Sequence, residues 1–309
     1  MNIFGVSTES ILECFTTLTS GKNASGILFM LLSMSAFALT DTLVKVSSSF
    51  LSPAQILFFL MGGGLVIFAA MAKIKGETMI SRNAIAPIML LRYFSEITGM
   101  VGMVMALSFV PLSTVGAITQ AAPMLVTVGA IFFLGEKVSW RRWTSIAVGF
   151  LGVLLIVQPG TEGFNVSVLW AVLAMVGMAI RDLTTRLTPS DVPSTSLATY
   201  TMVASLPFAI GWVFYNGERL IPVETDWLIA TPMIILGAVG YLLLIASIRV
   251  AEVSVVTPFR YSRIIFLLVL GVIVFQERPS ATMLTGAALI IVSGVYLVWR
   301  EHRVRKLGG

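Results

Sequence analysis

The sequence is divided into ten apolar stretches, most of about 20 residues, and this pattern limits the possible folds more than any other feature. They cover residues 25–46, 53–72, 86–109, 113–134, 143–158, 166–187, 195–215, 228–249, 253–275 and 281–299. A helix needs roughly 20 apolar residues to cross about 30 Å of hydrocarbon, whereas a barrel strand needs only about 10 alternating residues. We therefore predict an all-α integral membrane protein with ten transmembrane helices, whose short loops leave no room for a soluble domain.

Composition excludes several other classes of protein. Hydrophobic side chains make up 57% of the chain and charged ones only 11%, whereas soluble domains average about 25% charged residues. The net charge is only +5 and falls mostly in the loops of one membrane side, so we expect no nucleic-acid partner. The one cysteine, Cys14, and the one histidine, His302, exclude an internal disulfide and a Cys- or His-built metal site. We expect no cofactor and no metal.

Lysine and arginine are unequally distributed between the loops. When the N-terminus is placed in the cytoplasm, most of the 20 basic residues lie on the cytoplasmic side, and only Lys45, Arg219 and Arg278 lie at outer ends of spans. An excess of basic residues is typical of cytoplasmic loops. We therefore expect both termini in the cytoplasm, with residues 1–23 as a retained segment, either interfacial or disordered, and residues 301–309 as a basic tail.

The two halves of the chain resemble each other at a spacing of about 140 residues. Residues 135–139 (GEKVS) close the fourth stretch and residues 276–280 (QERPS) close the ninth. We call these the Glu motifs. Since each repeat has five helices, an odd number, the second copy must enter the membrane upside down. We predict two inverted five-helix repeats, at 24–159 and 164–300, a build found in many secondary transporters.

The paired Glu motifs, each followed by a Gly-rich helix, resemble those of the drug/metabolite transporter superfamily, specifically the EamA-type ten-helix permeases. The Gly-rich helices carry Gly149 and Gly152 in the first half and Gly286 and Gly294 in the second. Gln276 departs from the pattern, because a Gly often stands there. The resemblance covers about residues 25–299. It implies a secondary transporter in a bacterial inner membrane, in a superfamily that moves amino acids, nucleotide-like cofactors, vitamins and drugs in either direction.

Charged side chains inside the spans are costly and need a reason. In the third span, Arg92 and Glu96 are four residues apart, so they share a helix face and can pair along it. One interpretation is a salt bridge that only staples the helix. The other is that Arg92 lines a substrate cavity and Glu96 sets its availability.

The ninth span carries two further arginines, Arg260 and Arg263, three residues apart and without an acid in the same span. Two guanidiniums on one buried face favour an anionic ligand such as a carboxylate, which arginine binds bidentately. Alternatively, Arg260 extends to the interface. At the repeat spacing Arg260 corresponds to Gln120, which predicts opposite walls of one central cavity, unless Gln120 only bonds a neighbouring helix. The aromatic residues beside these groups could pack the substrate or simply the core: Tyr93, Phe259 and Tyr261.

Two more charged pairs lie near the ends of spans. Asp41 and Lys45 are four apart near the outer end of the first span, where we favour a local ion pair over a gate or a proton site. Arg181 and Asp182 end the sixth span, where we favour a cytoplasmic anchor over an inner gate.

These observations predict a secondary transporter that works by alternating access on a small polar metabolite bearing a carboxylate. The alternative is a carrier of a vitamin or nucleotide-like cofactor such as riboflavin or S-adenosylmethionine. No Walker A pattern is present, and the deep acids are isolated and lack histidine, which argues against ATP hydrolysis and against an enzyme. The expected partners are a small-molecule substrate and the lipid bilayer. Direction, proton coupling and the choice between monomer and homodimer stay open.

Overall fold

The computed structural model describes residues 21–77, 82–135, 139–160, 164–188, 193–220, 227–251 and 253–307. Within these ranges the chain is helical and has no strands, and ten helical segments are long and apolar enough to cross a membrane. The prediction of an all-α integral membrane protein with ten spans is confirmed. Most of the proposed N-terminal segment 1–23 lies outside the described residues, as do residues 136–138 of the first Glu motif.

The first half of the chain supplies five spans. They are α2 (Gly21–Ser47), α3 (Pro53–Ile74), α4 (Pro87–Phe109), a fourth span divided into α5 (Leu112–Thr119) and α6 (Ala122–Leu134), and α7 (Trp140–Val157); a short 3-10 turn, η1 (Arg82–Ile85), precedes α4. Local sequence explains several boundaries. Ser52 caps α3, because its hydroxyl accepts from the Gln55 amide at 3.2 Å while the Gln55 side chain accepts from the Ser52 amide at 3.1 Å.

The second half supplies the other five. They are α8 (Val168–Arg186), α9 (Ser194–Tyr215), α10 (Trp227–Val250), a ninth span divided into α11 (Val253–Val256), the 3-10 turn η3 (Thr257–Tyr261) and α12 (Ser262–Phe275), and α13 (Ala281–Leu307). Helix α13 continues beyond the predicted end of its span at residue 299, so most of the predicted basic tail is helical. The fourth and ninth spans, predicted as single helices, are both interrupted, at Gln120–Ala121 and at η3.

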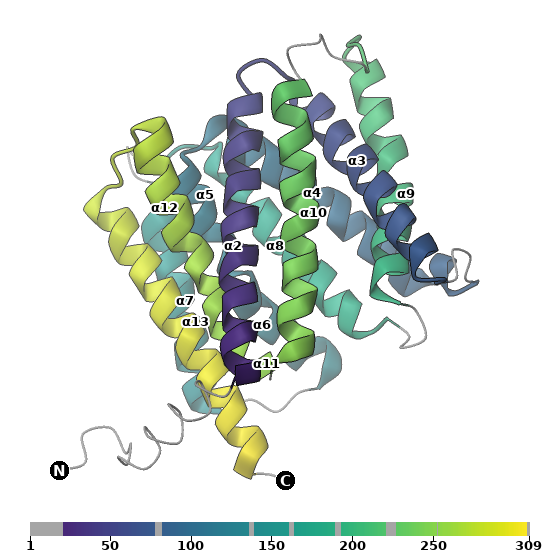
Figure 1. The fold of residues 1–309 in the computed structure, drawn as a ribbon. Helices are drawn as coiled ribbons and strands as arrows, with labels where there is room; N and C mark the ends of the chain where they lie inside the picture. The colour runs from purple at the N-terminus through teal and green to yellow at the C-terminus, as the bar shows by residue number, and fades with distance from the viewer. Residues whose placement is uncertain are drawn as a thin grey trace, which may run out of the picture.

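Each half packs mainly against the other. The most extensive helix contacts join α2 with α10, α3 with α9, α4 with α8 and α7 with α13, so every pair takes one helix from each half. Figure 1 shows α2 and α10 running side by side at the front of the bundle. An inverted repeat would produce this exchange of partners, and both the repeat and its boundaries stay predictions.

Glycines allow two of these pairs to approach closely. A Cβ atom on Gly152 of α7 would lie 2.7 Å from the carbonyl oxygen of Gly286 on α13. A Cβ atom on Gly177 of α8 would lie 2.5 Å from the amide nitrogen of Gly99 on α4. Small residues let membrane helices pack backbone to backbone. The α4–α8 contact holds the charged groups of the site described next.

Candidate functional site

An ion pair between α2 and α12 forms the first part of the site. Asp41 Oδ2 accepts hydrogen bonds from Arg263 Nε at 3.2 Å and Nη2 at 2.5 Å, and both side chains are largely buried. The Arg263 guanidinium carbon also lies 5.6 Å from the centre of the Phe37 ring. Asp41 was predicted to pair with Lys45 on its own helix, and the structure corrects this, because Asp41 faces α12.

Lys45 instead joins α2 to the end of α4. Its ammonium donates to the carbonyl oxygens of Leu107 at 3.1 Å and Val110 at 2.6 Å. The last carbonyls of a helix lack partners inside the helix, so a lysine at this end satisfies them and complements the helix dipole. Lys45 therefore joins the ends of α2 and α4.

Three charged groups on α4 and α8 form a second cluster. Arg181 contacts Glu96 at 3.3 Å and its neighbour Asp182 at 2.9 Å. The prediction that Glu96 pairs with Arg92 along one helix is corrected, because Glu96 contacts Arg181 across the close α4–α8 contact. Arg181 and Asp182 were expected mainly as an anchor at the membrane edge, which stays a prediction, and the structure places Arg181 beside the acid of the third span.

Arg92 is held by hydroxyl groups. Its Nε donates to Thr185 Oγ1 at 3.0 Å, its Nη1 donates to the hydroxyl of Thr201, and only 8% of the residue is exposed. Two threonines from two different helices of the second half thus orient a guanidinium from the first half. Sequence reasoning did not select these threonines, because threonine is common in membrane helices and neither lies near Arg92 in the chain.

The two broken spans meet directly. Gln120 lies at the break in the fourth span, and its Nε2 donates to the carbonyl oxygen of Arg260 at 2.7 Å in η3. The two residues were predicted on opposite walls of a cavity unless Gln120 only bonds a neighbouring helix, and the structure shows that interhelical hydrogen bond. Interrupted helices near the middle of a bundle often mark the ligand site of a transporter, because they expose backbone polar groups there.

Arg260 differs from the other three arginines of the site in the contacts of its side chain. Within the described part of the chain, its guanidinium makes no ion pair or hydrogen bond, although its charge acts on Asp182. The side chain is half-buried. Among these four arginines, the described residues therefore leave only the Arg260 guanidinium without a side-chain partner.

The three aromatic residues that were predicted to pack either the substrate or the core lie in different surroundings. Tyr93 packs with Met89 and Leu197, and its hydroxyl donates to the Ala84 carbonyl at 3.0 Å, so it belongs to a packing cluster. Phe259 packs against a small core cluster of α2. Tyr261 is buried, and its hydroxyl makes no hydrogen bond to the described residues.

Sequence reasoning missed Tyr241 of α10. This half-buried tyrosine is close enough to Arg92, Glu96 and Arg181 for electrostatic interactions with them. Its ring packs edge-on against Phe68, with 4.9 Å between the ring centroids. A tyrosine in the middle of an otherwise apolar span was the available signal. It is one of two tyrosines, with Tyr93, that lie close enough to Arg92 for an electrostatic interaction. Among the described residues, no three of His, Cys, Asp or Glu come together in a way that suits a metal ion.

Comparison with known proteins agrees with this arrangement. Ten membrane-spanning helices with charged groups buried between two halves define an integral membrane protein of the transporter class. Residues 24–158 and 165–300 each match the EamA-like transporter family, and the chain belongs to that family.

Several relatives are named as transporters. The chain is 24% identical to a protein named S-adenosylmethionine uptake transporter from Rickettsia felis, over 90% of this chain and 94% of the relative. It is 26% identical to a riboflavin transporter from Vibrio cholerae, over 91% and 95%. It is 25% identical to a pseudopaline exporter from Pseudomonas aeruginosa, over 88% and 95%. A crystal structure with 17% identity has the same fold, with a TM-score of 0.62 over 93% of this chain.

Proposed function

We propose that this transporter carries a small zwitterionic metabolite, with the carboxylate of the substrate bound by Arg260. The unengaged guanidinium of Arg260, half-buried at the break in the ninth span, is the observation that carries the proposal. A guanidinium in such a place binds a carboxylate bidentately and with charge assistance. Gln120, which bonds the Arg260 carbonyl, positions this segment for the ligand.

The placement of the charges, rather than their sum, favours a zwitterion over a simple anion, because the charge of Arg260 acts on Asp182. Four arginines face three carboxylates in the site, so the excess is a single positive charge. Asp41 offsets the charge of Arg263, and Glu96 and Asp182 surround Arg181. A substrate carboxylate adds the negative charge that Arg260 requires, while a cationic group of the same substrate would lie near Asp182.

S-adenosylmethionine combines these features, because it bears a carboxylate, cationic groups and an aromatic base. The name of the Rickettsia felis relative supports this candidate, and Tyr241 offers an aromatic face next to the charged cluster. We propose that transport follows alternating access, with both termini cytoplasmic and with Arg92, Arg263 and Tyr261 lining the path. The Vibrio cholerae relative is named a riboflavin transporter. Riboflavin has no carboxylate, so its binding would not need Arg260.

Uptake into proteoliposomes tests this proposal. Labelled S-adenosylmethionine and amino acids are offered to the wild type, to Arg260→Gln and to Arg219→Gln, an exposed arginine outside the site. Loss of a buried charged hydrogen bond costs about 2–5 kcal/mol, so half-saturation should rise roughly 30-fold or more in Arg260→Gln and stay unchanged in Arg219→Gln. Unchanged half-saturation for S-adenosylmethionine and amino acids in Arg260→Gln would refute the carboxylate role. If labelled riboflavin, offered in parallel, is transported and these two solutes are not, the vitamin is favoured.

A further inference from the structure

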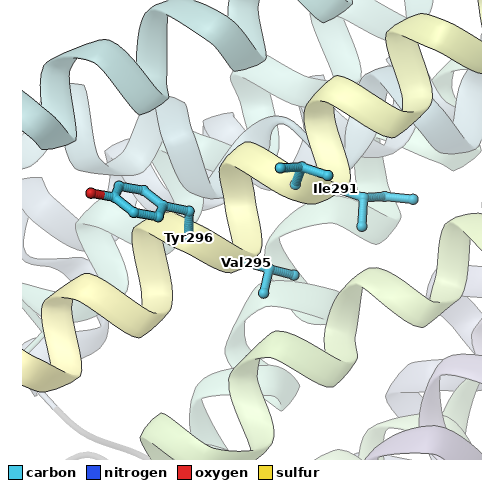
Figure 2. A pocket seen from close by; sticks show the side chains of 4 residues that line it. Ile291, Val295 and Tyr296 are labelled. Carbon is cyan, nitrogen blue, oxygen red and sulfur yellow. The ribbon is translucent and has the colours of Figure 1, made fainter. Parts of the chain in front are cut away.

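A groove on the outer side of the α7–α13 pair lies apart from the charged site. One hollow of about 500 Å³ is lined by Ile291, Val292, Val295 and Tyr296 of α13. Figure 2 shows the side chains of three of these residues projecting from that helix. A second hollow of about 370 Å³ shares Val292 and Tyr296 and extends to α7. Because the two hollows share residues, they form one continuous groove.

The walls of the groove are apolar and face away from the protein core. Val292 is 66% exposed and Val148, on the α7 side, is 37% exposed. In a membrane protein an apolar surface of this kind lies against lipid chains. The groove is therefore open to the bilayer, and between the two helices its lining includes Ser145 and Ser293.

The end of the groove at the start of α7 is polar and positively charged. Arg141 lines the second hollow together with Trp140 and Thr144. The Arg141 guanidinium carbon lies 5.7 Å from the centre of the Trp140 ring, and both side chains are exposed. A tryptophan beside an arginine is typical of the depth at which lipid headgroups lie.

The sequence adds further positive charge at this end. Helix α13 continues past Tyr296 to Leu307, and its final segment, residues 300–307 (REHRVRKL), has four basic residues and one acid. Arg142 follows Arg141 in α7. Basic pockets between membrane helices bind anionic headgroups, whereas a purely apolar groove would accept any lipid.

We propose that this groove binds one anionic phospholipid. Its phosphate is held by Arg141 at the Trp140 end, and one acyl chain lies along Val148, Val292 and Val295. Apolar walls that continue directly into a basic, aromatic end match the two halves of such a lipid. The bound lipid would stabilise the α7–α13 pair, which the Ser145 hydroxyl already joins at this depth by donating to the Ser293 carbonyl oxygen at 2.7 Å.

Thermal unfolding in detergent and native mass spectrometry of the full chain test the proposal. Phosphatidylglycerol should raise the unfolding midpoint and remain bound, and phosphatidylcholine with the same acyl chains should do neither. Arg141→Gln should weaken phosphatidylglycerol binding about fivefold, the equivalent of about 1 kcal/mol per basic residue at a membrane surface. Arg219→Gln, an exposed arginine far from the groove in sequence and outside its lining, is the matched control and should bind as the wild type.

A second variant separates the groove from the charge. Val292→Trp fills the groove and leaves Arg141 unchanged, and it should also reduce binding of phosphatidylglycerol. Because Val292 is exposed, this variant should fold. Equal effects of the two lipids, equal losses in Arg141→Gln and Arg219→Gln, or full binding in Val292→Trp would each overturn the proposal. The same midpoint shift with inorganic phosphate would indicate an anion site without a lipid, and a dimer that Val292→Trp dissociates would indicate a second chain in the groove.

Discussion

Asp41 and Arg263 form the most buried of the described ion pairs, and the loss of either partner should destabilise the protein more than the loss of both. Two unit charges about 4 Å apart attract by roughly 4 kcal/mol at an effective dielectric constant of 20. Removing one partner from a buried pair costs about 3–5 kcal/mol, because the other charge stays buried without compensation. Replacing both with neutral groups is often nearly neutral in stability.

The experiment compares Asp41→Asn, Arg263→Gln and the double variant in one detergent. Each single variant should unfold at a midpoint lower by on the order of 10 °C, and the double variant should recover most of that loss. Intrinsic fluorescence during heating follows unfolding, and a double-mutant cycle isolates the energy of the pair. The pair does not stabilise the fold as argued if the single variants unfold at the midpoint of the wild type. The same conclusion follows if the midpoint of the double variant falls by the sum of the two single decreases.

Two other substitutions test how the halves are joined. Gly152→Ala should destabilise the protein by about 1–3 kcal/mol, because its Cβ would approach the Gly286 carbonyl oxygen to 2.7 Å. The control Gly211→Ala has open space around the Cβ and should not lower the unfolding midpoint. Equal midpoints for the two variants would contradict the close contact. Glu277→Ala should cost about 0.5–2 kcal/mol and speed hydrogen exchange at the start of α5, because the Glu277 carboxylate accepts from the Leu112 amide at 2.5 Å. Unchanged exchange there would show that the cap is not needed.

The last of these contacts gives one of the Glu motifs a physical role. Glu277 accepts from the amide and the hydroxyl of Ser113, at 3.1 and 2.6 Å, in addition to the Leu112 amide. It therefore caps a helix of the first half from a loop of the second half. The sequence showed the motif but not this partner, which lies about 165 residues away in the chain.

The spans could be predicted because their signal is local. The predicted stretches 53–72 and 195–215 agree closely with α3 and α9, since hydropathy and the thickness of a bilayer set the length of each helix. The interruptions at Gln120 and η3 were missed, because an apolar window averages over a break of a few residues. Pro123 and Pro258, next to the two breaks, were the local signals for them.

The partners of the charged residues could not be predicted in this way. Spacing along one helix paired Asp41 with Lys45 and Arg92 with Glu96, whereas the fold pairs Asp41 with Arg263 and Glu96 with Arg181. The sequence also placed Arg260 and Arg263 together as candidates for an anionic ligand, and only the fold shows that Arg263 pairs with a carboxylate.

The sequence by itself determined that this chain spans a membrane ten times, carries arginines in its interior and belongs among transporters, because hydrophobicity and motif spacing are properties of single segments. The tertiary structure decided which arginines are paired with carboxylates or hydroxyl groups and which one is not. Hydrogen bonds and ion pairs act over a few ångströms, so their partners depend on which helices become neighbours in space.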